Sequence, residues 1–358
     1  MKTLGVIDEQ RLGFIPPKLW KAHEFCFFLH DRLVDMLIEY EARGAHTIVR
    51  DAFRKAISGR EKEFEGIELI DFLKKNNMVA PYKHHILSHI VMGLTSDMLN
   101  FLYESLNCFE KHKISVAFSL LRKPLKEHLL FLCWLIADEN DFISRFEADN
   151  YTSLNGVSKE KQITLFKTAI SKIPISNAFD AETIWDLIYS KNNPNGFEPT
   201  WQRATHLITS YGDLLKTEDY SINFIFENSF DGYYHEFVYS KLPYLLIFAT
   251  QILFECFNRI HAIHESTVSH SIIATMGCYE ALFLDGRKQP IRNMLTKQLS
   301  EFLKCIHCDA QLEINKKNAP MFYLSEQVEC KNCGLISSFP LYWILAKAKV
   351  NIVRDQND

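Results

Sequence analysis

Two apolar helical patterns, separated by a few polar residues, constrain the fold of this chain more than any other feature. In the segment 82–109 apolar residues recur at intervals of three and four, which predicts a helix with one apolar face. The segment 116–136 is the most apolar run of the chain and predicts a buried helix with a charged notch. A short connection favours antiparallel neighbours, so we expect a long helical hairpin that forms the core.

Helical patterns also dominate the rest of the chain. Between residues 150 and 232 turn-forming residues are frequent, and Ser158 and Asp180 are suited to cap short helices there. We find no strand periodicity and no internal repeat before residue 305. We therefore predict a predominantly α-helical domain over residues 1–300 and a small module over residues 301–358. The further segments with helical spacing are 18–43, 46–58, 67–75, 233–265, 269–284, 291–305 and 341–350.

Composition excludes several classes of protein. The 358 residues are 47% hydrophobic and 23% charged, which is ordinary for a folded soluble chain. The net charge of -4 gives no overall basic field for nonspecific binding to nucleic acid. The longest apolar runs are interrupted or too short for a bilayer, and the N-terminus turns acidic before an apolar signal region develops. We expect a cytoplasmic protein without a membrane span.

Four of the nine cysteines form two CxxC pairs, Cys305 with Cys308 and Cys330 with Cys333. A CxxC turn presents two thiolates, and two such turns complete the tetrahedron that structural zinc prefers. Four thiolates leave no open position, which argues against catalytic zinc. The region 301–340 resembles the zinc-ribbon family, with β-compatible pieces over 312–328.

The function of this module depends on what it contacts. Basic and acidic residues are equally numerous in 301–358, so the module lacks the cationic surface that would favour nucleic acid. We therefore favour a structural role or contact with a protein partner. A module this small has little core of its own, so metal binding should supply much of its folding free energy.

The central apolar helix carries the only cluster of cations. Arg122, Lys123 and Lys126 crowd one region, and His128 follows. Pro124 has no amide hydrogen, so it should start or kink a helix there.

The spacing Arg122-x5-His128 resembles the R-x4-6-H motif of the HEPN superfamily, which includes helical RNases. The resemblance implies a metal-independent RNA endonuclease with a toxin-like or defensive role, whose paired protomers join two motifs in one cleft. It implies that Arg122 holds the scissile phosphate and that His128 acts as general acid or base, while Lys123 and Lys126 are candidates for binding substrate. Lys123 and Pro124 depart from the usual motif. A straight helix would place Arg122 and His128 about 120° apart around its axis, so their convergence needs a kink or a second protomer.

A non-catalytic interpretation competes with this one. Arg122, Lys123 and Lys126 would then solvate the start of a helix, while His128 borders the core. The protein would be a helical interaction scaffold with structural zinc. The sequence leaves open whether the chain is an enzyme. On either interpretation we expect a homo-oligomer, such as a homodimer, that self-associates through the apolar helical hairpin.

Other groups of residues are secondary site candidates. Arg259-x4-His264 is a second match to the motif. His235 and Glu236 follow two tyrosines at an expected junction of loop and helix, where ligand-binding groups often lie, although aromatic capping explains them equally.

His85 and His89 stand four residues apart, a spacing that can chelate a metal but also suits a polar helix start. The chain has no GxxxxGK[ST], GxGxxG, HExxH or GxSxG motif. P-loop, Rossmann, zincin and α/β-hydrolase functions therefore lose their usual support.

Overall fold

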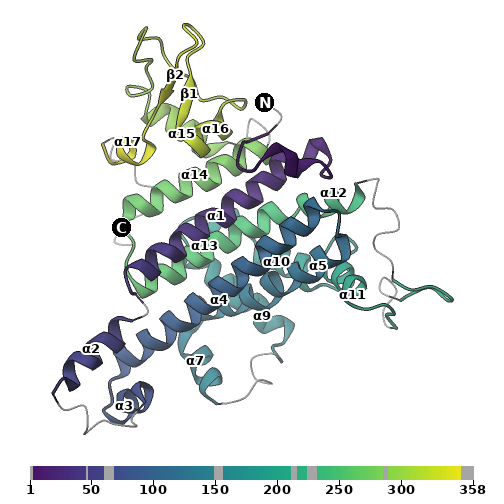
Figure 1. Ribbon diagram of the computed structural model, residues 1–358, viewed down its shortest axis with the longest axis vertical. Coiled ribbons are helices and arrows are strands. Elements are labelled where there is room, and N and C mark those ends of the chain that lie inside the picture. The colour runs from purple at the N-terminus through teal and green to yellow at the C-terminus, as the bar shows by residue number, and fades with distance from the viewer. Residues whose placement is uncertain are drawn as a thin grey trace. The chain divides into compact units, whose positions relative to one another are not determined.

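The described part of the protein is predominantly helical and carries one small sheet near its C-terminal end (Figure 1). The predicted fold class, a multi-helix protein built on a helical hairpin and followed by a small cysteine module, is confirmed. The computed structural model describes residues 3–45, 47–59, 68–148, 156–210, 216–223, 232–284 and 289–347.

The chain divides into two compact units, which we describe separately. The predicted domain boundary at residue 300 stays a prediction, because compactness does not show which segments fold independently. Unit 1 comprises Met1–Leu29, Asp231–Ile247 and Ile263–Asp358, and unit 2 comprises His30–Phe230 and Phe248–Ala262.

Unit 2 contains the predicted hairpin. The backbone amide of Lys113 donates to the carbonyl of Cys108 over 2.8 Å and so closes the turn between α4 and α5. The Ser105 hydroxyl of α4 donates to the carbonyl of Ala117 in α5, also over 2.8 Å. α4 begins three residues earlier than predicted, because Pro81 falls in its first turn, where a missing amide costs no helical hydrogen bond. The helices of this first part are α1 (Trp20–Ala42, shared with unit 1), α2 (Ile48–Ile57), α3 (Leu69–Lys75), α4 (Val79–Glu110) and α5 (Ile114–Lys123).

The second arm of the hairpin is not one regular helix. Pro124–His128 is a π-helical segment between α5 and α6, and we call it the π turn. α6 is almost wholly buried, so its last carbonyls cannot rely on water. The Lys172 ammonium donates to the carbonyls of Ile136 and Ala137, and the Arg259 guanidinium donates to that of Leu135. The remaining elements of unit 2 are α6 (Leu129–Ala137), α7 (Glu139–Glu147), α9 (Lys159–Ser171), α10 (Ala181–Tyr189), α11 (Phe197–Thr205) and most of α13 (Leu242–Ile260).

Unit 1 joins the chain start to the C-terminal module. The buried Glu24 carboxylate of α1 accepts from the amides of Leu4 and Val6 and so fixes the N-terminal segment. A Cβ added to Gly277 in α14 would lie 2.5 Å from the Tyr323 ring, so this glycine permits close packing of α14 on α16. The elements of unit 1 are the 3-10 turns Glu9–Leu12 and Pro17–Leu19, then α12 (Tyr233–Tyr239), α14 (Glu265–Phe283), α15 (Pro290–Gln298), α16 (Ala319–Ser325), β1 (Gln327–Glu329), β2 (Ile336–Ser338) and α17 (Leu341–Lys347).

Two sequence predictions need correction in unit 1. The interpretation of 312–328 as β-compatible pieces broken by Pro320 is wrong over Ala319–Ser325, which is helical. Pro320 lies in the first turn, where its missing amide has no helical acceptor to lose. The predicted single helix 233–265 is interrupted after Tyr239, and a new helix starts at Leu242.

The helical stretch Tyr233–Ile260 is long and apolar enough to cross a membrane by length and composition alone. However, 78% of its most apolar window is buried within the protein, as in the core helix of a soluble chain. It therefore gives only weak support to a membrane span, and the cytoplasmic location stays a prediction.

Candidate metal centre and the charged π turn

Two backbone turns present the four cysteines of the C-terminal module. In the first turn the Cys305 amide donates to the Ala310 carbonyl, and the Asp309 amide donates back to the Cys305 carbonyl, both over 2.9 Å. In the second turn the Cys330 amide donates to Leu335 and the Gly334 amide donates to Cys330, both over 2.8 Å. Asp309 and Gly334 occupy the left-handed region, at φ 58° and 72°, and this reverses the chain around the sulfur atoms. The antiparallel pair β1 and β2 supports the second turn.

The four sulfur atoms converge on one point. The Sγ atoms of Cys305 and Cys333 lie 3.6 Å apart, as do those of Cys308 and Cys330. All four lie within 4.8 Å of one another, and none belongs to a disulfide. Zinc–sulfur bonds of about 2.3 Å place the corners of a tetrahedron about 3.8 Å apart. The predicted ligand set therefore forms a cluster with the dimensions of a metal site.

Hydrogen-bond donors around the cluster favour thiolates, the form that binds metal. The Asn332 side chain, followed by the Ala310 amide, lowers the pKa of Cys308 to about 6. The amides of Cys308 and His307 lower the pKa of Cys305. The Leu335 amide lowers the pKa of Cys333, but burial and the neighbouring sulfur atoms outweigh it and raise that pKa to about 12. The pKa is therefore lowered for Cys305 and Cys308 and raised for Cys333.

The π turn in unit 2 brings together two of the residues of the charged notch. A π-helical turn places residues five apart on the same side, whereas an α-turn aligns residues three or four apart. Lys123 and His128 are five apart, and both reach Asp97 on α4. Lys123 Nζ lies 2.5 Å and His128 Nε2 lies 2.9 Å from the same oxygen, Asp97 Oδ2. The irregular turn therefore aligns Lys123, and not Arg122, with His128.

The charge states around Asp97 follow from these contacts. The Lys123 hydrogen bond is the main cause that lowers the pKa of Asp97. His128 is 4% exposed, and this burial lowers its pKa more than the nearby Asp97 raises it. At neutral pH His128 is therefore a neutral imidazole that donates from Nε2 to a carboxylate.

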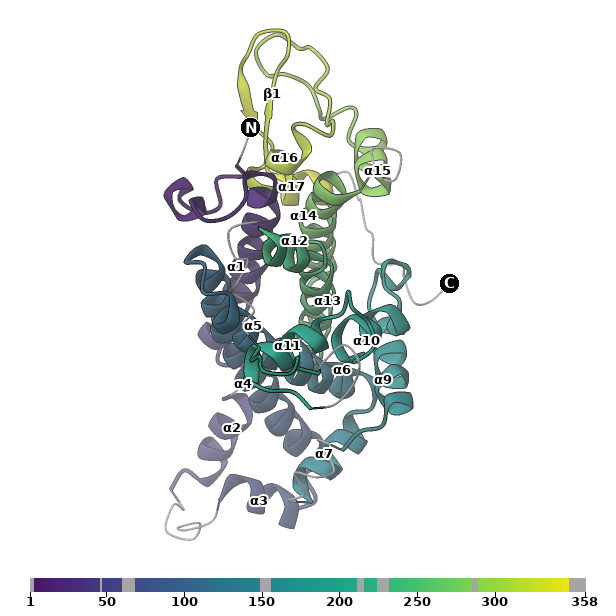
Figure 2. The same cartoon turned by 90° about the vertical axis from the view of Figure 1, so that its right-hand side faces the viewer.

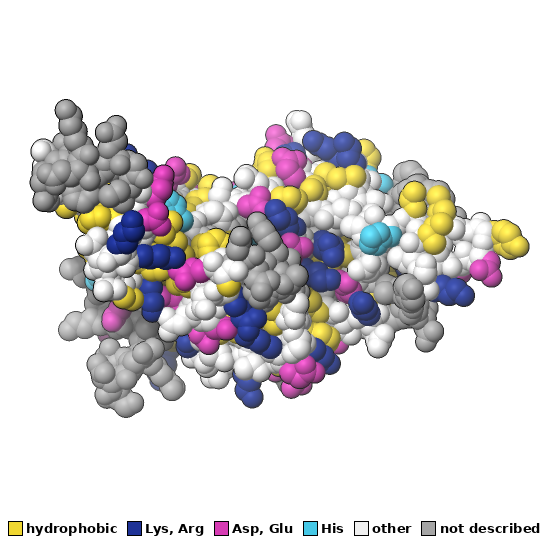
Figure 3. Space-filling view, turned by 90° about the horizontal axis from the view of Figure 1, so that it is seen from below, with side chains coloured by type: hydrophobic (Ala, Val, Ile, Leu, Met, Phe, Trp, Pro, Cys, Tyr) yellow, Lys and Arg dark blue, Asp and Glu magenta, His cyan; other side chains and the backbone are white. Residues whose placement is uncertain are grey.

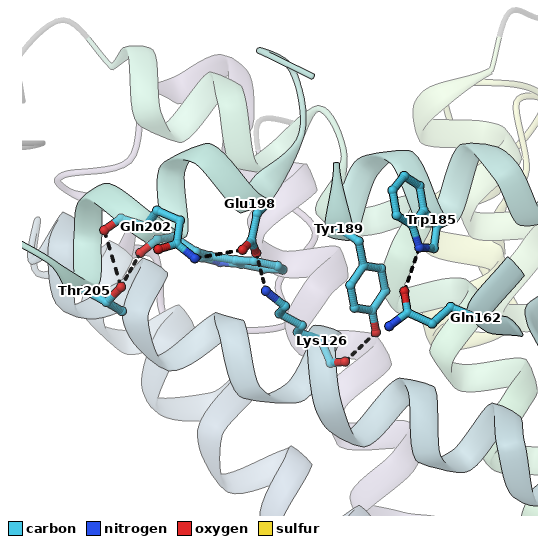
Figure 4. Close-up of polar contacts among 8 residues, drawn as sticks. Lys126, Gln162, Trp185, Tyr189, Glu198, Gln202 and Thr205 are labelled. Carbon is cyan, nitrogen blue, oxygen red and sulfur yellow. Dashed lines mark hydrogen bonds and ion pairs between the residues drawn. The ribbon is translucent and has the colours of Figure 1, made fainter. Parts of the chain in front are cut away.

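Lys126 belongs to a separate network with residues of α10 and α11 (Figure 4). Its ammonium lies 2.6 Å from Glu198 Oε2 on α11, and Gln202 donates to the second carboxylate oxygen over 2.8 Å. Glu198 is 1% exposed, so this pair is largely removed from water. The hydroxyl of the half-buried Tyr189 on α10 donates to the Lys126 carbonyl over 2.5 Å, and desolvation raises the pKa of Tyr189 well above its usual value. Figure 2 shows α10 beside α9.

The predicted catalytic pair is not joined within one chain. Among the described residues, no hydrogen bond links Arg122 to His128. Arg122 Nε and His128 Nδ1 are each buried without a hydrogen-bond partner in this part of the chain. Lys123 and Lys126, the predicted substrate-binding residues, are instead paired with Asp97 and Glu198.

The secondary candidates make local contacts. Arg259 pairs with Glu255 over 3.0 Å in addition to capping α6. His264 caps α14, where its Nδ1 accepts from the Ser266 amide over 3.3 Å. His235 is buried in α12, and Glu236 on the same helix forms an ion pair with Lys18. Residues 228–231 of the predicted aromatic segment lie outside the described residues.

Sequence reasoning missed Asp97, Glu198 and Tyr189, which complete the environment of the π turn. Asp97 lies 26 residues before Lys123, and Glu198 lies 72 residues after Lys126. No local motif marks such partners. The turn-rich composition of 150–232 gave only a weak hint that short helices would supply them.

Comparison with protein-family models, with curated proteins and with solved structures found no match for this chain. The resemblance to HEPN proteins therefore gains no support from these comparisons.

Proposed function

We propose that the protein is a helical interaction scaffold whose C-terminal module is held together by one structural zinc ion. The observation that carries this proposal is the convergence of Cys305, Cys308, Cys330 and Cys333 within 4.8 Å. Thiolates suit zinc, and four of them close its coordination shell. The zinc would tie the two backbone turns together and stabilise a module that has little core of its own.

The surface of the module supports contact with a protein partner. Ile306, between the first two cysteines, is 85% exposed, and Leu335 and Ile336 after the last cysteine are also exposed. Apolar side chains held on rigid turns suit the core of a protein interface better than binding to phosphate. Separately from the module, the face that Figure 3 shows from below carries Lys and Arg side chains interspersed with Asp and Glu side chains. Self-association through the helices and a cytoplasmic location belong to the same proposal.

The zinc content of freshly purified protein tests this function. We expect close to one zinc per chain, and a chelator that removes it should make the C-terminal module sensitive to protease. A content well below one zinc per chain would contradict the proposal.

A HEPN-like RNA endonuclease is the second candidate. Arg122 Nε and His128 Nδ1 keep unused hydrogen-bonding capacity within the described residues, and a neutral imidazole is the form that a general base requires. A second protomer would have to supply the facing motif.

RNA cleavage by the zinc-loaded protein, in buffer without added metal, separates the two candidates. Arg122→Ala and His128→Ala should each abolish cleavage if the endonuclease proposal holds, whereas His261→Ala, a substitution of an exposed histidine, should not. Absence of cleavage, or cleavage that survives both substitutions, would exclude this candidate.

A further inference from the structure

A cavity of about 490 Å³ lies in unit 2 between α2, α3 and the start of α4. Its volume is in the range of pockets that hold small molecules. The lining is almost entirely apolar, and it includes Ile48, Ala52, Phe53, Phe72, Met78 and His84.

α2 contributes one wall but buries none of its own residues. All of its apolar residues except Ile57 line the cavity, and Ile48 stays exposed there. Phe53 and Phe72 meet across the cavity wall with ring centroids 4.8 Å apart. Apolar surface of this extent gains free energy when an apolar occupant removes it from water.

The α4 side of the cavity provides polar groups. His84 lines the cavity, and its Nε2 atom is buried without a hydrogen-bond partner among the described residues. His85, 9% exposed, follows it, and its Nδ1 atom also lacks a partner there. A buried imidazole nitrogen without a partner costs free energy unless a ligand atom reaches it.

The local field at these histidines is positive. Burial is the main cause that lowers the pKa of His85, and the nearby His89, Arg50 and His84 lower it further. Arg50 on α2 is exposed, and its Nε lies 4.0 Å from Asp51 Oδ1, which is too far for a hydrogen bond. Arg50 does not itself line the cavity, but its guanidinium keeps unused donors and its charge acts on His85, so it adds positive charge beside the histidines.

We propose that this cavity binds an amphiphilic carboxylate, with its hydrocarbon chain against Phe53 and Phe72 and its carboxylate at His84, where Arg50 adds positive charge. The apolar lining favours the hydrocarbon chain of the ligand, and the unpaired imidazole nitrogen and the guanidinium favour its anionic head group. The ligand class is a free fatty acid of medium length. The proposal does not depend on the zinc module or on the π turn.

Calorimetric titration of the full zinc-loaded chain with decanoate and with 1-decanol tests the proposal. We expect saturable binding of both ligands, with decanoate bound about tenfold more tightly because only the carboxylate forms charge-assisted hydrogen bonds. Arg50→Gln should bring the two affinities close together while it leaves the binding of decanol unchanged. Equal affinities in the unsubstituted protein would overturn the assignment of the head group.

Ala52→Trp tests the location, because an indole on the lining should fill the cavity and weaken both ligands at least tenfold. Lys55→Trp is the matched control, since it adds the same side chain to α2 at an exposed position outside the lining. Circular dichroism checks that both variants stay folded. Undiminished binding by the Ala52 variant would overturn the proposal.

Vesicles distinguish a free fatty acid from a membrane surface. We expect no sedimentation of the protein with phosphatidylcholine vesicles, with or without phosphatidylglycerol. Binding to the anionic vesicles together with no saturable binding of decanoate would overturn the proposal in favour of a membrane-binding face.

Discussion

Short sequence motifs predicted both the cysteine cluster and a site at the π turn, but only the residues of the cysteine cluster converge in space. The two CxxC motifs, 21 residues apart in the chain, bring four sulfur atoms to one point. Arg122 and His128, only six positions apart, make no hydrogen bond to each other within the described residues. Instead, the cations near them are neutralised by carboxylates from other helices. Proximity in sequence was thus the poorer guide to proximity in space.

Local backbone geometry explains the difference. Each CxxC motif lies in a tight turn whose own hydrogen bonds direct both sulfur atoms to the same side. On a helix the direction of a side chain depends on the phase of every intervening residue. One π turn changes that phase, so that position 123 and not position 122 aligns with position 128.

Removal of one cysteine should have the largest effect on stability, and it should affect the C-terminal module but not the π turn. Cys330→Ser takes one thiolate from the site, so we expect loss of the bound zinc and unfolding of the C-terminal module, with the helices of unit 2 retained. Zinc analysis and limited proteolysis measure this outcome. Cys108→Ser is the matched control outside the cluster and should keep its zinc. A Cys330 variant that still binds one zinc per chain would contradict the assignment of the four cysteines as the zinc site.

Substitution of Lys126 should have the next largest effect. Lys126→Met leaves the Glu198 carboxylate buried without its cation, and such a loss costs about 3–5 kcal/mol of unfolding free energy. Lys123→Met is the control, because its partner Asp97 is 43% exposed and water can replace the cation, so we expect a loss below about 1 kcal/mol. Denaturant titration measures both. Equal losses would show that burial does not distinguish the two networks.

The substitution of Asp97 should have the smallest effect, a shift in the pKa of His128. Asp97→Asn removes the charge that raises the pKa of His128, so this pKa, already below 6.5, should fall further. Since the folded protein holds His128 neutral, its contribution to stability is present above the unfolded pKa and is lost as pH falls toward the folded one. The lowered pKa of Asp97 gives the same sign at more acidic pH. An NMR titration of His128 that shows a pKa above 6.5 would contradict this account.

Much of the fold could be predicted from sequence because its signals are local. Apolar spacing located α1 and α4, and the two CxxC motifs gave the cysteine cluster. The helix Ala319–Ser325 was missed because Pro320 was interpreted as a breaker and not as a first-turn residue. The π turn was anticipated only as a possible kink at Pro124.

The environment of the candidate sites was harder to predict because it depends on tertiary packing. Asp97 and Glu198 carry no motif, and only the packing of α4 and α11 against the π turn makes them partners of Lys123 and Lys126. The apolar face of α2 was readable as helical spacing. The cavity that this face lines depends on where α3 and α4 lie.

X-ray absorption at the zinc edge shows directly whether the four cysteines hold one structural zinc ion. We expect four sulfur neighbours at about 2.3 Å, with no nitrogen or oxygen neighbour in the first shell. A first shell that contains nitrogen or oxygen, or a protein that purifies without zinc, would contradict this expectation.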